Sequence, residues 1–167
     1  RGVEGVETRM IGRDAELERL QTTFRRVIAT GQAASVTVAG AAGLGKSRLL
    51  YEFENWVDLQ PVNVQLYRGR ARLETKHLPY GLLRDVFVFR CGIYDDDTAA
   101  AARDKLVAGF RAVFVRDDDD DDDVERKAHL VGHLLGYDFS AGPHIRPLLG
   151  EPRQLRSQAL FYLTEYF

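Results

Sequence analysis

One short stretch constrains the fold of this chain more than any other, the eight residues GAAGLGKS at positions 40–47. Its three glycines allow backbone angles and close approaches that a Cβ atom would block. A β-branched run, Ser35–Ala39, comes directly before it and indicates a buried strand. An apolar stripe of helical spacing begins after it, from about Lys46. The sequence therefore predicts a strand, a tight glycine-rich turn and a helix in direct succession.

The spacing of these residues matches the phosphate-binding pattern G-x-x-x-x-G-K-[ST]. In such a loop the backbone N–H groups form a concave nest for an anion at the positive end of the following helix. Lys46 is predicted to reach the terminal phosphates as the catalytic residue, and the Ser47 hydroxyl to ligate Mg²⁺. The predicted nucleotide contacts in this stretch are Gly40, Ala41, Ala42, Gly43, Leu44, Gly45, Lys46, Ser47 and Arg48. The alternative is an ordinary glycine-rich turn beside a surface lysine.

A second strand is expected after Pro61, where Val62, Val64 and Leu66 alternate with polar residues and Tyr67. A strand, a helix and a strand within about 35 residues predict a βαβ unit with a right-handed crossover. We therefore expect an α/β fold, in which a partial parallel sheet carries the phosphate loop.

The rest of the chain is predicted to be mostly helical. Apolar residues at positions 17, 20, 24 and 27 indicate a helix that starts at Asp14 and ends at Thr30-Gly31. Further helices are expected after Pro79, after a capping Thr98, over residues 124–136 and over Arg153–Phe167.

Length and composition favour one globular domain. The chain has 167 residues, of which residues 1–10 read as a linker and 11–167 as the domain. No apolar stretch reaches the ~18 residues of a membrane span. The single cysteine, Cys91, excludes an internal disulfide and favours a reducing, cytoplasmic setting.

The charge is distributed unevenly along the chain. Residues 1–90 have a net charge of +4 and residues 91–167 one of −6, when histidine is counted as neutral. The mildly basic first part suits a small anionic ligand, and its charge is too weak to indicate nucleic acid as a partner.

Two segments together resemble a known family. Residues 11–17 (IGRDAEL), followed by GAAGLGKSRLL, resemble the start of an ATPase domain of the AAA/STAND type. The similarity extends to ATPases fused to class III adenylate/guanylate cyclase domains or placed ahead of helical repeats in transcriptional regulators. It implies ATP and Mg²⁺ as cofactors, and a fused output domain controlled by the nucleotide state. It also implies that Ile11, Gly12 and Arg13 lie against the adenine base, although Arg13 could equally be a solvated charge at a helix start.

One element of that family's pattern is missing from the sequence. A complete ATPase of this type has an apolar strand that ends in an acidic residue, which completes the Mg²⁺ site and positions water. No such strand is found, and we expect the chain to stop just before it. Two other functions stay open: a phosphate-loop kinase with Arg68–Lys76 as a basic lid, and a non-catalytic DNA-associated or interaction module.

Three charged or polar features are expected to have no catalytic or binding role. The acidic run Asp117–Asp123 is predicted to be a solvated, mobile loop that nucleotide binding does not need, because seven like charges repel one another. His129 and His133 have the spacing of half a zinc site, but no further ligand accompanies them. The basic side chains between Arg68 and Lys76, which include Arg70 and Arg72, are predicted to be solvated after the second strand.

Overall fold

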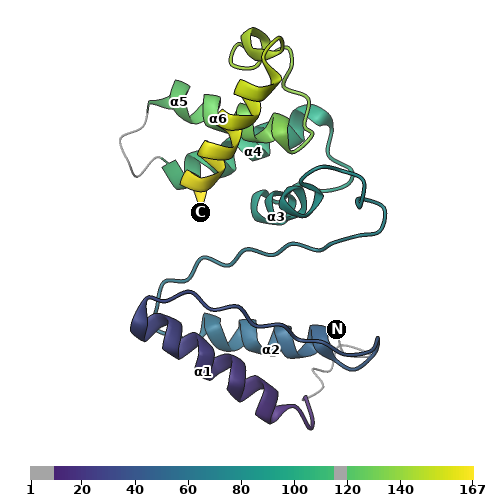
Figure 1. Cartoon of the computed structure of the whole chain (residues 1–167), viewed down its shortest axis with the longest axis vertical. Helices are drawn as coiled ribbons and strands as arrows, with labels where there is room; N and C mark the ends of the chain where they lie inside the picture. Colours follow the sequence, from purple (N-terminus) through teal and green to yellow (C-terminus); the bar gives the residue numbers. More distant parts are fainter. Residues whose placement is uncertain (1–9, 115–119) are drawn as a thin grey trace. The chain divides into compact units, whose positions relative to one another are not determined.

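The structure is a computed structural model that describes residues 10–114 and 120–167 (Figure 1). It divides into two compact units, of which the first ends at Gln65 and the second begins at Leu66. The first unit contains helices α1 (Asp14–Thr30) and α2 (Lys46–Asp58). The second contains α3 (Gly81–Cys91), α4 (Ala99–Phe114), α5 (Asp121–Leu134), the 3₁₀ turn η3 (Arg146–Leu148) and α6 (Pro152–Tyr166).

The helices predicted from the sequence are confirmed. The first helix begins at Asp14 and ends at Thr30, where Gly31 adopts a left-handed conformation with φ 66° and donates its N–H to the Val27 carbonyl. At the start of α4 the Thr98 hydroxyl accepts a hydrogen bond from the Ala101 N–H at 3.1 Å, as expected of a capping residue. Local signals of spacing and capping therefore located these helices well.

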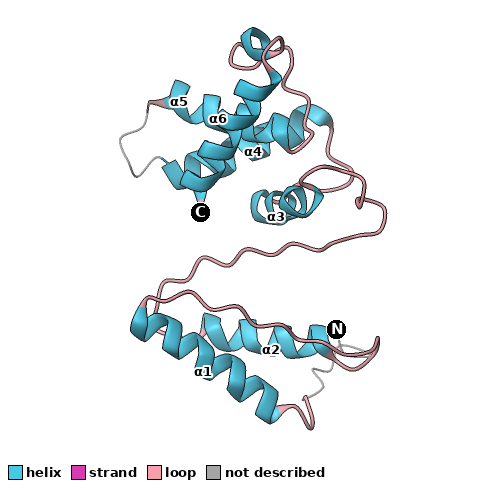
Figure 2. Ribbon diagram, in the orientation of Figure 1, coloured by secondary structure: helices cyan, strands magenta, loops and turns pink. Residues whose placement is uncertain are grey.

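The predicted parallel sheet is wrong. Residues 35–39 and 62–66 are loops, and the described part of the chain contains no strand (Figure 2). A β-branched run favours an extended backbone, but a strand forms only when a neighbouring segment pairs with it. Val36 is instead 51% exposed and Val64 37% exposed. The described chain is thus helical, and the expected α/β class with its βαβ unit is not observed.

Packing of α1 against α2 organises the first unit. Phe24 of α1 makes edge-to-face contacts with Phe53 and Trp56 of α2, with ring centroids 6.2 and 5.6 Å apart. Leu20 of α1 and Leu49 of α2 are also buried. Because the same helix that carries Trp56 starts at the glycine-rich loop, these contacts place the loop next to the start of α1.

The second unit has the larger core. Its centre is an aromatic cluster in which Phe110 of α4 stacks on Phe87 of α3 at 5.7 Å and contacts Tyr166 of α6 at 4.8 Å. Helix α5 comes close to α4 at Gly132, where an added Cβ atom would lie 2.6 Å from the Leu106 side chain. The glycine therefore permits close approach of the two helices.

One buried charge lies at the edge of this core. The Lys127 side chain on α5 is 9% exposed, and its Nζ lies 3.1 Å from Asp123 and 3.7 Å from Glu165 of α6. The ammonium also lies over the ring of Phe114 at 4.4 Å. Burial opposes ionisation of Asp123, but its hydrogen bonds with Arg126 and Lys127 outweigh burial and lower the pKa of Asp123 below its usual value.

The acidic run departs from its predicted state as a loop. Asp117–Asp119 lie outside the described residues, whereas Asp121–Asp123 form the first turn of α5. Carboxylates at that position stabilise a helix because its N-terminus carries a partial positive charge. At least this part of the run is therefore structural.

No helix among the described residues is both long enough and apolar enough to cross a membrane.

We expect Asp123→Asn to destabilise the second unit by about 2 kcal/mol, because it leaves the buried Lys127 with weaker pairing. The midpoint of urea unfolding, followed by circular dichroism, measures this loss. The pKa of Asp123 is lowered in the folded state. Ionised Asp123 therefore stabilises the fold fully above pH 3.8, its usual pKa, and this stabilisation is lost as the pH falls through the lowered pKa.

Asp120→Asn is the matched control, since Asp120 caps the same helix without a side-chain cap bond and asparagine caps equally well. Equal unfolding midpoints for the two variants at pH 7 would contradict the role assigned to the pair of Asp123 and Lys127.

Candidate functional site

The glycine-rich loop turns through two left-handed glycines. Gly43 has φ 81° and Gly45 has φ 75°, a backbone region that residues with a Cβ atom rarely adopt. Gly45 is also the N-cap of α2, which begins at Lys46. The backbone therefore enters the helix directly from the loop, as the sequence pattern predicts.

Lys46 folds back over the start of the loop. Its Nζ donates hydrogen bonds to the carbonyl oxygens of Gly40 at 2.8 Å and Ala41 at 2.7 Å. The ammonium group thus lies beside the loop backbone, at the end of the helix where an anion is favoured. Ser47 follows in the first turn of α2 and is exposed.

A second cation reaches the loop from Arg13, the N-cap residue of α1. The Arg13 guanidinium donates one hydrogen bond to the Leu44 carbonyl at 3.0 Å and another to the Glu16 carboxylate at 2.6 Å. The hydrogen bond from Arg13 is the main cause of a Glu16 pKa below its usual value. Glu16 therefore stays ionised at neutral pH and holds the guanidinium beside the loop.

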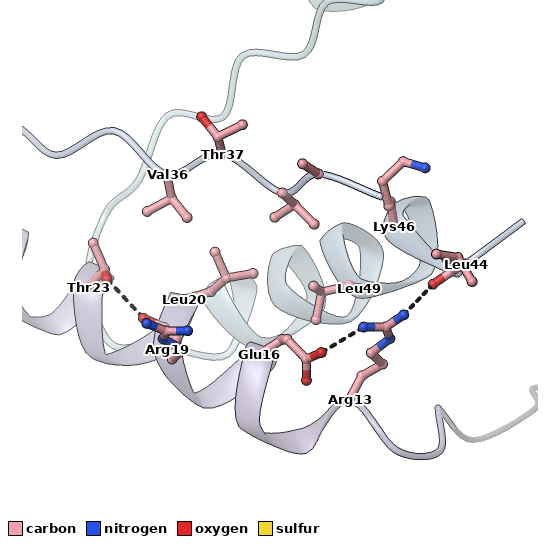
Figure 3. Close-up of a pocket in the computed structure, with 13 residues that line it drawn as sticks. Arg13, Glu16, Arg19, Leu20, Thr23, Val36, Thr37, Leu44, Lys46 and Leu49 are labelled. Carbon is pink, nitrogen blue, oxygen red and sulfur yellow. Dashed lines mark hydrogen bonds and ion pairs between the residues drawn. The ribbon is translucent and has the colours of Figure 1, made fainter. Parts of the chain in front are cut away.

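These residues border a cavity of about 490 Å³ in the first unit (Figure 3). Leu20, Val36 and Leu49 contribute apolar surface to it, while Arg13, Glu16 and Leu44 meet at one end. Its full lining comprises Arg13, Glu16, Arg19, Leu20, Thr23, Val36, Thr37, Val38, Ala39, Leu44, Gly45, Lys46 and Leu49. Such a cavity, apolar with a few polar groups at its edge, is typical of small-molecule sites.

The remaining predicted site residues have less defined surroundings. Ile11 is 88% exposed and precedes Gly12, whose φ is 74°. Ala41 and Ala42 are exposed in the loop. Arg48 forms an ion pair with Glu52, which lies one turn further along α2.

Sequence reasoning missed the contact between Arg13 and Leu44. The two residues lie 31 positions apart, and no local pattern links them. The sequence signal was only that a basic residue, Arg13, and an acidic one, Glu16, stand three positions apart at the start of a helix.

The other candidate clusters make contacts of their own in the structure. The described residues contain no group of three or more histidine, cysteine, aspartate or glutamate side chains that could hold a metal ion. In the basic segment Asp85 accepts a hydrogen bond from the Arg70 N–H at 2.7 Å and pairs with the Arg72 side chain at 3.6 Å. Arg68 lies over the ring of Phe89 at 5.1 Å.

Comparison with protein families finds a match to the AAA ATPase domain over residues 9–149. The match covers most of the chain, and the protein belongs to this family. Membership supports nucleotide binding and ATP binding. Comparisons with curated proteins and with solved structures found no match.

We expect Gly45→Ala to destabilise the first unit by about 1 kcal/mol, because alanine is strained at a positive φ. Gly40→Ala is the matched control within the same loop, since Gly40 has no positive φ and an added Cβ atom would meet only the flexible Leu44 side chain at 3.4 Å. Thermal unfolding of both variants tests this difference. A loss of stability in Gly40→Ala as large as that in Gly45→Ala would refute the argument from the positive φ of Gly45.

Proposed function

We propose that this chain is the ATP-binding module of a regulatory ATPase of the AAA/STAND type, in which the nucleotide state controls a fused output domain. The observation that carries the proposal is the loop at 40–47, which turns through Gly43 and Gly45 directly into α2 and has Lys46 folded over it. Family membership supports the nucleotide-binding part. The regulatory part rests on the resemblance to ATPases fused to cyclases or found in transcriptional regulators.

The residues of the site fit a nucleotide with its metal ion. The start of α2 has no side-chain cap among the described residues, so its first N–H groups are open to an anion. Lys46 would bind the terminal phosphates, and the exposed Ser47 hydroxyl would ligate Mg²⁺. A bound Mg²⁺ would neutralise charge on the phosphates.

The base is assigned to the segment before α1. Ile11 offers an exposed apolar side chain, and Gly12 adds a backbone that can approach a planar ring closely. The cavity beside α1 is large enough to accept part of a nucleoside.

Lys46→Ala is expected to weaken ATP binding at least tenfold, because the phosphates lose a direct cationic partner and the loop loses two hydrogen bonds. Titration with a fluorescent ATP analogue in the presence of Mg²⁺ measures the affinity. Lys76→Ala, which removes an exposed lysine from the second unit, serves as the control. Equal affinity in the parent chain and in Lys46→Ala would overturn the proposed site.

Hydrolysis by this chain alone is expected to be negligible even where ATP binds. Among the described residues Glu16 is the one carboxylate that lines the cavity, and it already accepts a hydrogen bond from Arg13. Without a free acidic group to complete the metal site and orient water, turnover falls steeply, since a misplacement of about 1 Å can cost a hundredfold in rate.

Phosphate release from purified chain, with Lys46→Ala as the background, tests this expectation. Turnover that depends on Lys46 would show that a catalytic acid lies within these 167 residues.

A further inference from the structure

The orientation of the loop's N–H groups follows from what its carbonyls bind. The described chain has no cis peptide bonds, so each carbonyl and the N–H of the next residue point in opposite directions. The Leu44 carbonyl points toward the Arg13 guanidinium. The Gly45 N–H, on the same peptide unit, therefore points away from Arg13.

Lys46 has the same effect at the other end of the loop. By accepting hydrogen bonds from its ammonium group, the Gly40 and Ala41 carbonyls direct the N–H groups of Ala41 and Ala42 away from Lys46. Two cations therefore fix peptide orientations on both sides of Gly43. Lys46 belongs to the loop motif itself, whereas Arg13 reaches the loop from 31 residues away.

Arg13 is suited to this contact by its shape as well as its charge. Its planar guanidinium donates from separate nitrogens to Glu16 and to Leu44, which a lysine ammonium on a flexible stem does less well. Glu16 belongs to the first turn of α1 and anchors the guanidinium on that helix. The position of α1 is in turn fixed by its packing on α2.

We propose that Arg13 is a positioning residue that sets the orientation of the phosphate loop through the Leu44 carbonyl. The inference deepens the proposed function and rests on it for the identity of the ligand. It assigns Arg13 to the phosphate part of the ligand, not to the base against which the family resemblance would place it.

A base contact and a contact that orients the loop affect the affinity for ligands with another base, or with no base, differently. A base contact contributes only where a particular base is present. A contact that orients the loop contributes to every ligand with a phosphate chain. Inorganic triphosphate has no base at all, so it separates the two roles directly.

The first experiment titrates ATP, GTP and inorganic triphosphate, each with Mg²⁺, into the parent chain and three variants. Arg13→Gln is expected to weaken binding of all three ligands by a similar factor of about five, the order expected for one charge-assisted hydrogen bond that is partly exposed. Arg13→Lys keeps the charge but cannot donate from two separate nitrogens in the same geometry, so we expect an intermediate loss of affinity. Arg26→Gln, which removes an exposed arginine further along α1, is expected to match the parent chain.

A loss confined to ATP would overturn the inference in favour of a base contact. Unchanged affinity of Arg13→Gln for all three ligands would overturn it as well, while leaving the proposed nucleotide site intact.

The second experiment needs no ligand. Amide hydrogen exchange of the parent chain is compared with that of Arg13→Gln and Arg26→Gln, with attention to residues 41–47. Faster exchange at the loop in Arg13→Gln alone is the expected result, since the Leu44 carbonyl is no longer held. Identical exchange in all three chains would refute the positioning role.

The two experiments separate the two proposals. A parent chain that binds none of the ligands, but whose loop exchanges faster in Arg13→Gln, would refute the nucleotide site and retain the positioning role. Thermal unfolding of each variant checks that α1 and α2 stay folded, so that a general loss of structure is not taken for a local one.

Discussion

Packing between α1 and α2 is the constraint on which the candidate site depends. Phe24 lies against Phe53 and Trp56, and this contact fixes the two helices side by side. The loop ends where α2 begins, and Arg13 stands where α1 begins. A guanidinium from one helix can therefore reach a carbonyl at the end of the other, which neither element could achieve alone.

Much of the local structure was predictable because its causes are local. The stripe with Leu20 and Phe24 gave the extent of α1, and Thr98 gave the start of α4, since spacing and capping act within a few residues. The turn into α2 was equally clear, because Gly45, which has a positive φ, stands at a position where the pattern requires glycine, whereas Gly43 occupies a variable position. These signals needed no knowledge of distant residues.

Two features that the sequence did not predict depend on distant partners, and a third has a local cause. Residues 35–39 have the composition of a strand, yet nothing in that composition supplies a neighbouring strand, and the described chain forms none. The hydrogen bond between Arg13 and Leu44 joins residues 31 positions apart, and no local sequence pattern at either residue indicates it. Asp121–Asp123 were read as a repelling run, but a helix N-terminus accommodates their charge.

The cations of the loop also bear on how tightly it can hold an anion. Lys46 and Arg13 already donate hydrogen bonds to backbone carbonyls, so both charged groups have partners before any ligand binds. In the proposed site a phosphate bound by Lys46 would replace its two hydrogen bonds to Gly40 and Ala41, so the net gain in binding free energy would be smaller than for an unpaired ammonium group. Arg13 would keep its bond to Leu44 when an anion binds, because the Gly45 N–H on the same peptide unit points in the opposite direction. In the proposed site the two basic residues would thus have different roles: Lys46 would exchange backbone carbonyls for the phosphate, and Arg13 would hold the Leu44 carbonyl.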